Sequence, residues 1–203
     1  MITLHGAAAS RASRSLLALE ELGLSYAHVP FAPWSDAAHA ETLARINPNA
    51  RVPVLEDDGL VLFESMAINL YLADRYGAPP FWPERPRDRG LVYQWSVWSQ
   101  TEIDVRARHA ARLSSDAAVK RSAEAERLAA LAILDRALAG RPYLLCDAFT
   151  LADLDVAATL CEPWENGRVD GELDPADHGL AFLADWLARC TGRASWERVR
   201  ALL

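Results

Sequence analysis

The stretch Arg51-Val52-Pro53-Val54-Leu55, with Glu64-Ser65 nine residues further on, decides the fold of this chain. Proline has no backbone N–H and cannot donate within a sheet, so a strand is expected to begin just after it. The spacing predicts two short strands joined by a tight turn at Asp58-Gly59, and then a helix that begins at Ser65. The segment therefore predicts a β-hairpin followed by a helix.

The same residues are suited to hold a small peptide. Because Pro53 cannot donate to a sheet, the backbone of Val52 is left to hydrogen-bond another chain. The Glu64 carboxylate and the Ser65 hydroxyl, at the positive N-terminus of a helix, suit the ammonium and the carboxylate of a peptide end. Taken alone, Ser65 is more simply a helix cap and Glu64 a solvated charge. Beside Val52, they predict a receptor for a small zwitterionic peptide.

Hydrophobic periodicity before this segment predicts a β-α-β-α unit. Leucines recur at helical spacing after a first short strand, and Gly23 follows in the position where helices commonly end. The Asn47-Pro48 pair stops a second helix, because the residue before a proline disfavours helical backbone. The complete order is βαβαββα, with strands over 2–5, 25–29, 54–56 and 60–63 and helices over 10–22, 37–46 and 65–76.

A proline-rich stretch over 77–83 marks the expected domain boundary. We expect one domain over 1–77, a linker over 78–86 and an all-helical domain over 87–203. Alanine, leucine and arginine dominate after the boundary, and β-branched residues become sparse. The predicted fold class is α/β followed by all-α. Helical patterns run over about 88–113, 117–139, 150–163, 178–190 and 195–202.

Two helices of the second half carry informative patterns. Thr150-Leu151-Ala152-Asp153 has the form of a capping box, in which Asp153 reaches back to the amide of Thr150 and starts a buried apolar helix. In the first long helix Leu91, Trp95 and Trp98 share one face at helical spacing, and we expect most of that face to lie in the core.

Composition excludes several classes of function. The 203 residues carry a formal net charge of −7, which disfavours nucleic acid because phosphate binding needs a basic face. No stretch approaches the roughly 18 consecutive apolar residues that cross a bilayer, and the chain shows no basic leader, so we expect a cytoplasmic protein. Cys146, Cys161 and Cys190 lack a CxxC spacing, which predicts buried small side chains rather than disulfides, and no metal site.

Together these motifs resemble the cytosolic glutathione transferases, in their serine-using, bacterial-like form. Each motif is weak alone, but their order and spacing match the family over essentially the whole chain. The resemblance implies a thioredoxin-like glutathione-binding domain followed by a helical bundle domain. The matching stretches are Ser10-Arg11-Ala12-Ser13-Arg14, Leu19-Glu20-Glu21-Leu22-Gly23-Leu24, 47–55, Glu64-Ser65 and 150–153.

The family's chemistry needs a group that favours the thiolate of glutathione. A free thiol has a pKa near 8.5, so only a small fraction is ionised at neutral pH. A hydroxyl at a helix N-terminus stabilises the thiolate. Ser10 is the candidate because it begins the expected helix and stands before Arg11-Ala12-Ser13-Arg14, which resembles the stretch that follows the family's catalytic serine. Ser10 also fits a plain N-cap; Ser13 is its rival as catalyst, and Arg11 could assist through its charge.

The resemblance also implies roles for the residues that hold glutathione. Glu64 and Ser65 would bind the γ-glutamyl end, and Val52, joined to Pro53 by a cis peptide bond, would bind the cysteinyl backbone. Arg51 and His39 are candidates to bind the glycine carboxylate, but each is equally or more simply explained as a surface residue. Asp104 would reach the glutathione bound to a neighbouring subunit, or else it lies on a solvated helix face.

One residue departs from the family pattern. Ala50 stands where the family often has glycine, a change expected to matter little if the backbone there is not left-handed.

The resulting hypothesis is a homodimeric glutathione transferase that joins the glutathione thiolate to a small hydrophobic electrophile. Glutathione is then a co-substrate, and no cofactor is implied. Two alternatives remain on the same scaffold: a glutathione-dependent peroxide or disulfide reductase or isomerase, and a non-catalytic interaction module.

Overall fold

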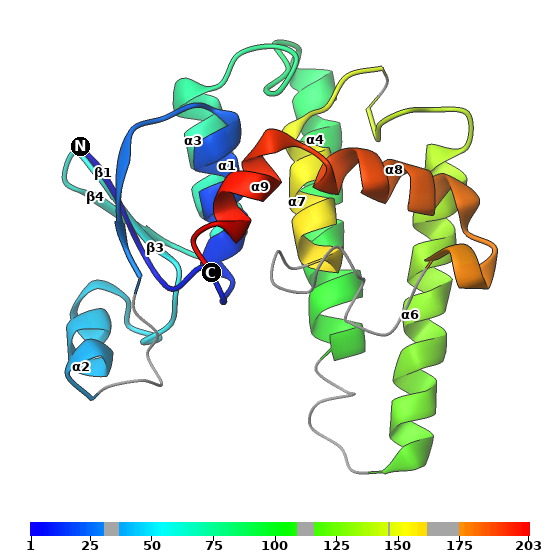
Figure 1. Ribbon diagram of the computed structural model, residues 1–203, viewed down its shortest axis with the longest axis horizontal. Coiled ribbons are helices and arrows are strands. Elements are labelled where there is room, and N and C mark those ends of the chain that lie inside the picture. Colours follow the sequence, from blue (N-terminus) through cyan, green and yellow to red (C-terminus); the bar gives the residue numbers. More distant parts are fainter. Residues whose placement is uncertain (31–36, 109–115, 146, 162–174) are drawn as a thin grey trace. The chain divides into compact units, whose positions relative to one another are not determined.

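The computed structural model describes residues 1–30, 37–108, 116–145, 147–161 and 175–203 (Figure 1). The chain divides into two compact units, Met1–Ala78 with Arg193–Leu203, and Pro79–Gly192. Residues 193–203 are expected from the sequence in the helical domain, whereas in the structure they belong to the first unit. The reason is that Ser195, Trp196 and Val199 are buried and the helix that carries them packs on the first helix of the chain.

The first unit contains the predicted βαβαββα order and the C-terminal helix. Its elements are β1 (Ile2–His5), α1 (Ala12–Glu21), β2 (Tyr26–Val29), α2 (Ala37–Ile46), β3 (Val54–Asp57), β4 (Leu60–Phe63), α3 (Ser65–Tyr76) and α9 (Ala194–Arg200). The strands pair in the order β2-β1-β3-β4. Strand β1 is parallel to β2 and antiparallel to β3, and β3 is antiparallel to β4.

Both faces of the sheet are covered, because successive side chains of a strand point to opposite faces. Val54 lies opposite Phe63 and packs against Leu43 of α2. The neighbouring pair, Leu4 and Leu55, lies on the other face, where α1 and α3 pack together on the sheet. The hydrophobic core of the unit therefore forms on both sides of one four-stranded sheet.

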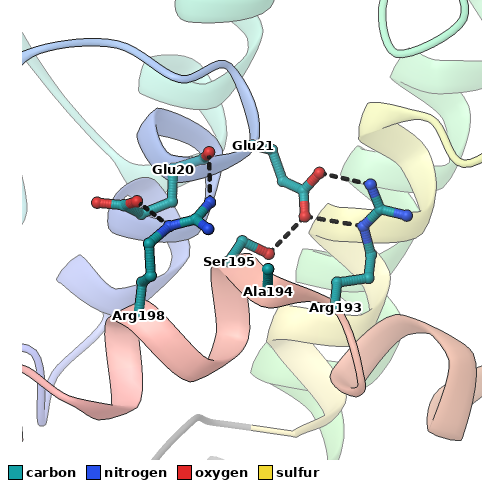
Figure 2. A pocket seen from close by; sticks show the side chains of 6 residues that line it. All are labelled: Glu20, Glu21, Arg193, Ala194, Ser195 and Arg198. Atoms are coloured by element: carbon teal, nitrogen blue, oxygen red, sulfur yellow. Dashed lines mark hydrogen bonds and ion pairs between the residues drawn. The ribbon is translucent and has the colours of Figure 1, made fainter.

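Two ion pairs fix α9 to α1, as Figure 2 shows. The Arg193 guanidinium donates to both oxygens of Glu21, at 2.8 and 2.7 Å, and the Ser195 hydroxyl donates to the same carboxylate. Arg198 donates to the Glu20 carboxylate at 2.5 Å. Burial raises the pKa of Glu21, but the hydrogen bonds from Arg193 and Ser195 outweigh it and hold that pKa below its ordinary value.

The second unit is a bundle built around one buried helix. Its elements are α4 (Pro86–Trp98), a π-helix η1 (Ser99–Arg108), α6 (Ala117–Leu138), α7 (Leu151–Leu160), a 3-10 helix η3 (Pro175–His178) and α8 (Ala181–Thr191). All ten residues of α7 are buried, and α4, η1 and α8 pack around it. No helix among the described residues has the length and apolar character to cross a membrane.

The predicted capping box forms at the start of α7. One oxygen of the buried Asp153 carboxylate accepts from the Thr150 amide and hydroxyl, both at 2.9 Å. The other oxygen accepts from the Leu144 amide at 2.8 Å and from Trp186 Nε1 at 2.9 Å. Burial raises the pKa of Asp153, and these donors act against it. Asp153 therefore joins α7 to the preceding segment and to α8, which the local motif alone does not show.

The prediction that the aromatic face of α4 lies in the core is wrong. Leu91 is exposed, and Trp95 and Trp98, which meet edge to face at 5.2 Å between ring centroids, are only half-buried. The buried face instead carries Ser96, whose hydroxyl donates to the Asp155 carboxylate of α7 at 2.6 Å. The side of α4 that faces inward thus carries Val92 and Ser96 and includes a polar contact with α7.

Two of the three cysteines are described. Cys161 and Cys190 are buried, as predicted, and Cys146 lies outside the described residues.

Candidate functional site

Two segments of the first unit meet at Gly6, between β1 and α1. Gly6 has φ +135°, a conformation that side chains other than glycine rarely adopt. A Cβ at this position would lie 2.7 Å from the Ala12 Cβ and 2.9 Å from the Val52 Cβ. Glycine therefore allows Val52 to approach the start of α1 closely. A glycine directly after a strand is the only signal of this contact in the sequence.

The Val52–Pro53 peptide bond is cis, as the family resemblance implies. Strand β3 begins at Val54, directly after the proline, which agrees with the missing N–H of Pro53. Val52 is half-buried and packs beside Leu43 and Val54. Val52 is thus held from both sides, by the core under α2 and by Gly6.

Asn47 shapes the loop that leads to Val52, a role that the sequence analysis does not assign. Its buried side chain donates from Nδ2 to the Arg51 carbonyl at 2.7 Å and accepts at Oδ1 from the Asn49 amide at 2.9 Å. The Asn47 carbonyl accepts from the Ala50 amide at 2.8 Å. Asparagine before a turn commonly bonds the backbone two residues on, which is the signal that could have identified it.

The condition under which alanine at position 50 is expected to matter little is not met. Ala50 has φ +48°, which is left-handed backbone. The Cβ of an L-residue costs roughly 1–2 kcal/mol in this region relative to glycine. Ala50 therefore places local strain in the loop that carries Arg51 and Val52.

The turn from β4 into α3 brings Glu64 and Ser65 to the N-terminus of a helix. Glu64 precedes the first helical residue with φ +72° and ψ +115°, an uncommon conformation for a residue other than glycine. Its side chain is exposed, whereas Ser65 is buried in the first turn of α3. Backbone strain of this kind costs about 1–3 kcal/mol and clusters at functional sites.

The Ser10 hydroxyl is already hydrogen-bonded within its own loop. It donates to the Ala7 carbonyl at 2.6 Å and accepts from the Ala12 amide at 3.1 Å. Ser10 is 8% exposed and precedes the helix, which begins at Ala12 rather than at Ser10. The hydroxyl thus supports the start of α1, and its single proton points at Ala7.

Ser13 is not suited to activate the thiol in place of Ser10. It lies inside α1 and is fully buried, so its hydroxyl is not accessible to a ligand. Arg11 is exposed at the N-cap position of α1, and Arg51 is exposed beside Val52. Both guanidiniums are therefore accessible from solvent.

The structure corrects the expectation for Asp104 and does not test the one for His39. Asp104 is 1% exposed within η1, so its carboxylate neither lies on a solvated face nor projects toward a neighbouring subunit. A π-helix has more residues per turn than an α-helix, which shifts the faces expected from α-helical spacing. His39 belongs to α2, but its side chain lies outside the described part of the chain.

Comparison with known proteins identifies the family. A family model described as "Glutathione S-transferase, N-terminal domain" matches residues 1–74. Glutathione S-transferase GstB of Escherichia coli K12 is 33% identical over 170 residues, which cover 77% of this chain and 80% of that protein. The chain belongs to the glutathione S-transferase family. The predicted fold class is thereby confirmed.

Two further similar proteins carry different names. The protein named Disulfide-bond oxidoreductase YfcG of Escherichia coli K12 is 30% identical over 194 residues, covering 87% of this chain and 86% of that protein. A solved theta class glutathione S-transferase of Xanthomonas axonopodis pv. citri, with glutathione bound, superposes with a TM-score of 0.79 at 28% identity. That alignment covers 97% of this chain and 95% of the other.

Within the described ranges, no cluster of three or more His, Cys, Asp or Glu side chains is arranged to bind a metal ion.

Proposed function

We propose that this protein is a glutathione transferase that joins the thiolate of glutathione to a small hydrophobic electrophile. The observation that carries the proposal is the contact at Gly6, where Val52 lies against the start of α1. The peptide-holding segment and the loop of Ser10 are thereby neighbours in one unit. Membership of the family supports the same activity, and the solved Xanthomonas relative holds glutathione.

The first unit supplies the proposed contacts to glutathione. The Glu64 carboxylate pairs with the γ-glutamyl ammonium, and Ser65 at the N-terminus of α3 receives the α-carboxylate, because the exposed amides of a helix start favour anions. The backbone of Val52 binds the cysteinyl unit, and the exposed Arg51 pairs with the glycine carboxylate. Glutathione acts as co-substrate, and the reaction needs no metal or nucleotide.

Ser10 stabilises the thiolate by turning its own hydroxyl hydrogen toward the sulfur. Rotation about the side-chain bond moves the hydroxyl hydrogen from the Ala7 carbonyl to the sulfur, while Oγ continues to accept from Ala12. The positive end of α1 acts in the same direction. The thiolate sulfur then attacks the electrophilic carbon, a carbon–sulfur bond forms, and the leaving group departs with its electron pair.

Exchange of Ser10 tests this step. A hydrogen bond to a charged group contributes about 1.5–3 kcal/mol, which corresponds to roughly 1–2 pKa units, so Ser10→Ala should raise the pKa of bound glutathione by that amount. Ser10→Thr keeps the hydroxyl and should leave the pKa near the wild-type value. Thiolate absorbance as a function of pH gives both pKa values. An unchanged pKa in Ser10→Ala would remove Ser10 from the chemistry.

A second candidate activity is glutathione-dependent disulfide reduction, favoured by the 30% identity to the protein named Disulfide-bond oxidoreductase YfcG. All three cysteines lie beyond residue 145, so the first unit offers no protein thiol for a mixed disulfide. Such a reaction would use two glutathione thiols in succession. Rates with an activated aryl halide and with hydroxyethyl disulfide, measured on one preparation, distinguish the two activities.

Further properties follow from the same assignment. We assign the electrophile to side chains of the helical unit, and we propose a homodimer that works in the cytoplasm in detoxification, since reducing compartments keep glutathione as the free thiol. The buried Asp104 takes no part in the dimer. Sedimentation equilibrium measures the oligomeric state, and calorimetric titration with glutathione excludes or supports the alternative of a non-catalytic module.

A further inference from the structure

The end of β2 holds both polar groups of Gly6. The Gly6 amide donates to the Val29 carbonyl at 2.9 Å, and the Gly6 carbonyl oxygen lies 2.8 Å from Nε2 of His28. His28 and Val29 are the last two residues of β2, so one short segment contacts Gly6 on both sides. Gly6 is also the residue at which Val52 approaches the start of α1. His28 therefore acts at the point where the two proposed parts of the glutathione site meet.

The partner of His28 fixes which of its ring nitrogens carries hydrogen. A carbonyl oxygen can only accept, so Nε2 must be protonated and must be the donor. A hydrogen on Nε2 is present in one of the two neutral tautomers and in the imidazolium. The other neutral tautomer would direct a lone pair at the carbonyl oxygen, and the contact excludes it. The hydrogen bond therefore persists whether or not the ring is charged.

His28 supplies a donor that the sheet does not. Gly6 is the first residue after β1, where the ladder with β2 ends. No backbone amide in the described part of the chain donates to the Gly6 carbonyl. Glycine has more backbone freedom than any other residue, so a hydrogen bond on each side of it limits how the following loop can turn. His28 thus fixes the direction in which the chain leaves the sheet.

The loop that begins at Gly6 carries Ser10. Ala7 follows Gly6 directly, and its carbonyl accepts from the Ser10 hydroxyl at 2.6 Å. A rotation of the peptide between Gly6 and Ala7 would displace that carbonyl and the hydroxyl bonded to it. We propose that His28 is a positioning residue of the transferase, which keeps the Ser10 hydroxyl within reach of the glutathione sulfur by holding the Gly6 carbonyl. This inference rests on the proposed role of Ser10.

Three substitutions of His28 in the full-length protein test the proposal. His28→Gln places an amide nitrogen as many bonds from Cα as the ring Nε2, so it can still donate to Gly6. His28→Asn carries the same amide one bond shorter and falls short of the carbonyl, and His28→Leu has no donor. The comparison of Gln with Asn decides the question even if His28→Leu does not fold. Urea denaturation shows which variants are folded.

The loss of the hydrogen bond should affect the chemistry more than the binding. In His28→Asn and His28→Leu the kcat with an activated aryl halide should fall about three- to tenfold, the effect of one lost neutral hydrogen bond. The pKa of bound glutathione should rise, by less than in Ser10→Ala. The Kd of glutathione should stay within about twofold, because the proposed contacts at Glu64, Ser65 and Arg51 are unchanged. His28→Gln should restore both the kcat and the pKa.

Tyr26→Phe is the matched control. Tyr26 lies two residues earlier on β2, and its hydroxyl donates to Glu20 at 2.7 Å, near the C-terminal end of α1. The substitution removes a hydrogen bond between β2 and α1 without touching the loop of Ser10. The kcat and the pKa of bound glutathione in Tyr26→Phe should therefore equal those of the wild type.

The ring of His28 can also be observed without any activity. Nitrogen-15 NMR of histidine-labelled protein distinguishes protonated from unprotonated ring nitrogens, and the His28 signals are those missing from the His28→Gln spectrum. Nε2 should be protonated at every pH at which the protein is folded. An unprotonated Nε2 at neutral pH would overturn the proposal, because the ring could not then donate to Gly6.

Three kinetic outcomes would also overturn it. The first is a wild-type kcat and bound-thiol pKa in both His28→Asn and His28→Leu. The second is an equal loss in all three His28 variants, which would make the histidine a packing residue of β2. The third is the same loss in Tyr26→Phe, which would assign the effect to the strand as a whole. If Ser10→Ala raises the pKa while the His28 variants do not, the proposed function stands and only the positioning by His28 fails.

Discussion

Gly6→Ala is expected to weaken both the fold and the binding of glutathione, because Gly6 lies where Val52 meets α1. The new Cβ would lie 2.7 Å from the Ala12 Cβ and 2.9 Å from the Val52 Cβ. Both neighbours are first side-chain atoms, fixed to the backbone, so neither can rotate away. The backbone of Val52, the proposed contact of the cysteinyl unit, must therefore move by roughly half an ångström or more.

The magnitude has two parts. A residue other than glycine held at φ +135° costs about 1–3 kcal/mol. Overpacking against Ala12 and Val52 adds about 1–3 kcal/mol. The free energy of unfolding should therefore fall by about 2–6 kcal/mol. Displacement of a substrate-positioning backbone by a fraction of an ångström is expected to raise the Kd for glutathione about tenfold or more.

Gly23→Ala is the matched control. Gly23 also has positive φ, +63°, but a Cβ there meets nothing within 4 Å. Both substitutions restrict the unfolded chain equally, so the difference between them comes from the contact at Gly6 and from the backbone strain specific to φ +135°. Urea denaturation measures the two free energies of unfolding, and calorimetric titration measures the two Kd values. Wild-type affinity for glutathione in Gly6→Ala would refute the conclusion that this contact positions Val52 for the ligand.

Three further predictions concern stability. Ala50→Gly should raise the free energy of unfolding by a few tenths to about 1 kcal/mol in urea denaturation, because relief of left-handed strain is partly offset by greater freedom of the unfolded chain; a decrease would contradict the strain. Asp153→Ala should lower it by about 3–5 kcal/mol, since the donors that share this buried carboxylate lose their acceptor, and Asp153→Asn should cost less; equal losses would contradict this account. Because the pKa of Glu21 is lowered from its ordinary value of 4.5, its ionised carboxylate stabilises the fold above that pH, and this stability is lost as the pH falls through the lowered pKa. Arg193→Gln should therefore make the free energy of unfolding fall less steeply with acidification. An unchanged pH dependence would show that the Arg193–Glu21 pair does not stabilise the fold.

The predictions from the sequence succeeded where the signal is local. Leucine spacing, Gly23 and Asn47-Pro48 place the helices of the first unit within two residues of their observed bounds, because helix ends depend on the few residues around them. The capping box at Thr150 formed for the same reason, since its donors and acceptors lie within one helical turn.

The errors arose where a residue's surroundings come from distant parts of the chain. The buried face of α4 includes the hydroxyl–carboxylate contact between Ser96 and Asp155, 59 residues apart. Asp104 is buried within a π-helix, whose faces differ from those that α-helical spacing predicts. Helical spacing alone contains neither fact.

By itself, the sequence determined the order of the elements and the family, and it supplied the candidate contacts to glutathione, because these depend on residue type and short spacing. Only the tertiary structure decided that Val52 lies close to the start of α1 at Gly6, and that the Ser10 hydroxyl donates a hydrogen bond to the Ala7 carbonyl. It also decided that the His28 ring lies against the Gly6 carbonyl. These relations depend on distances between segments, which packing fixes and which no pattern along the chain encodes.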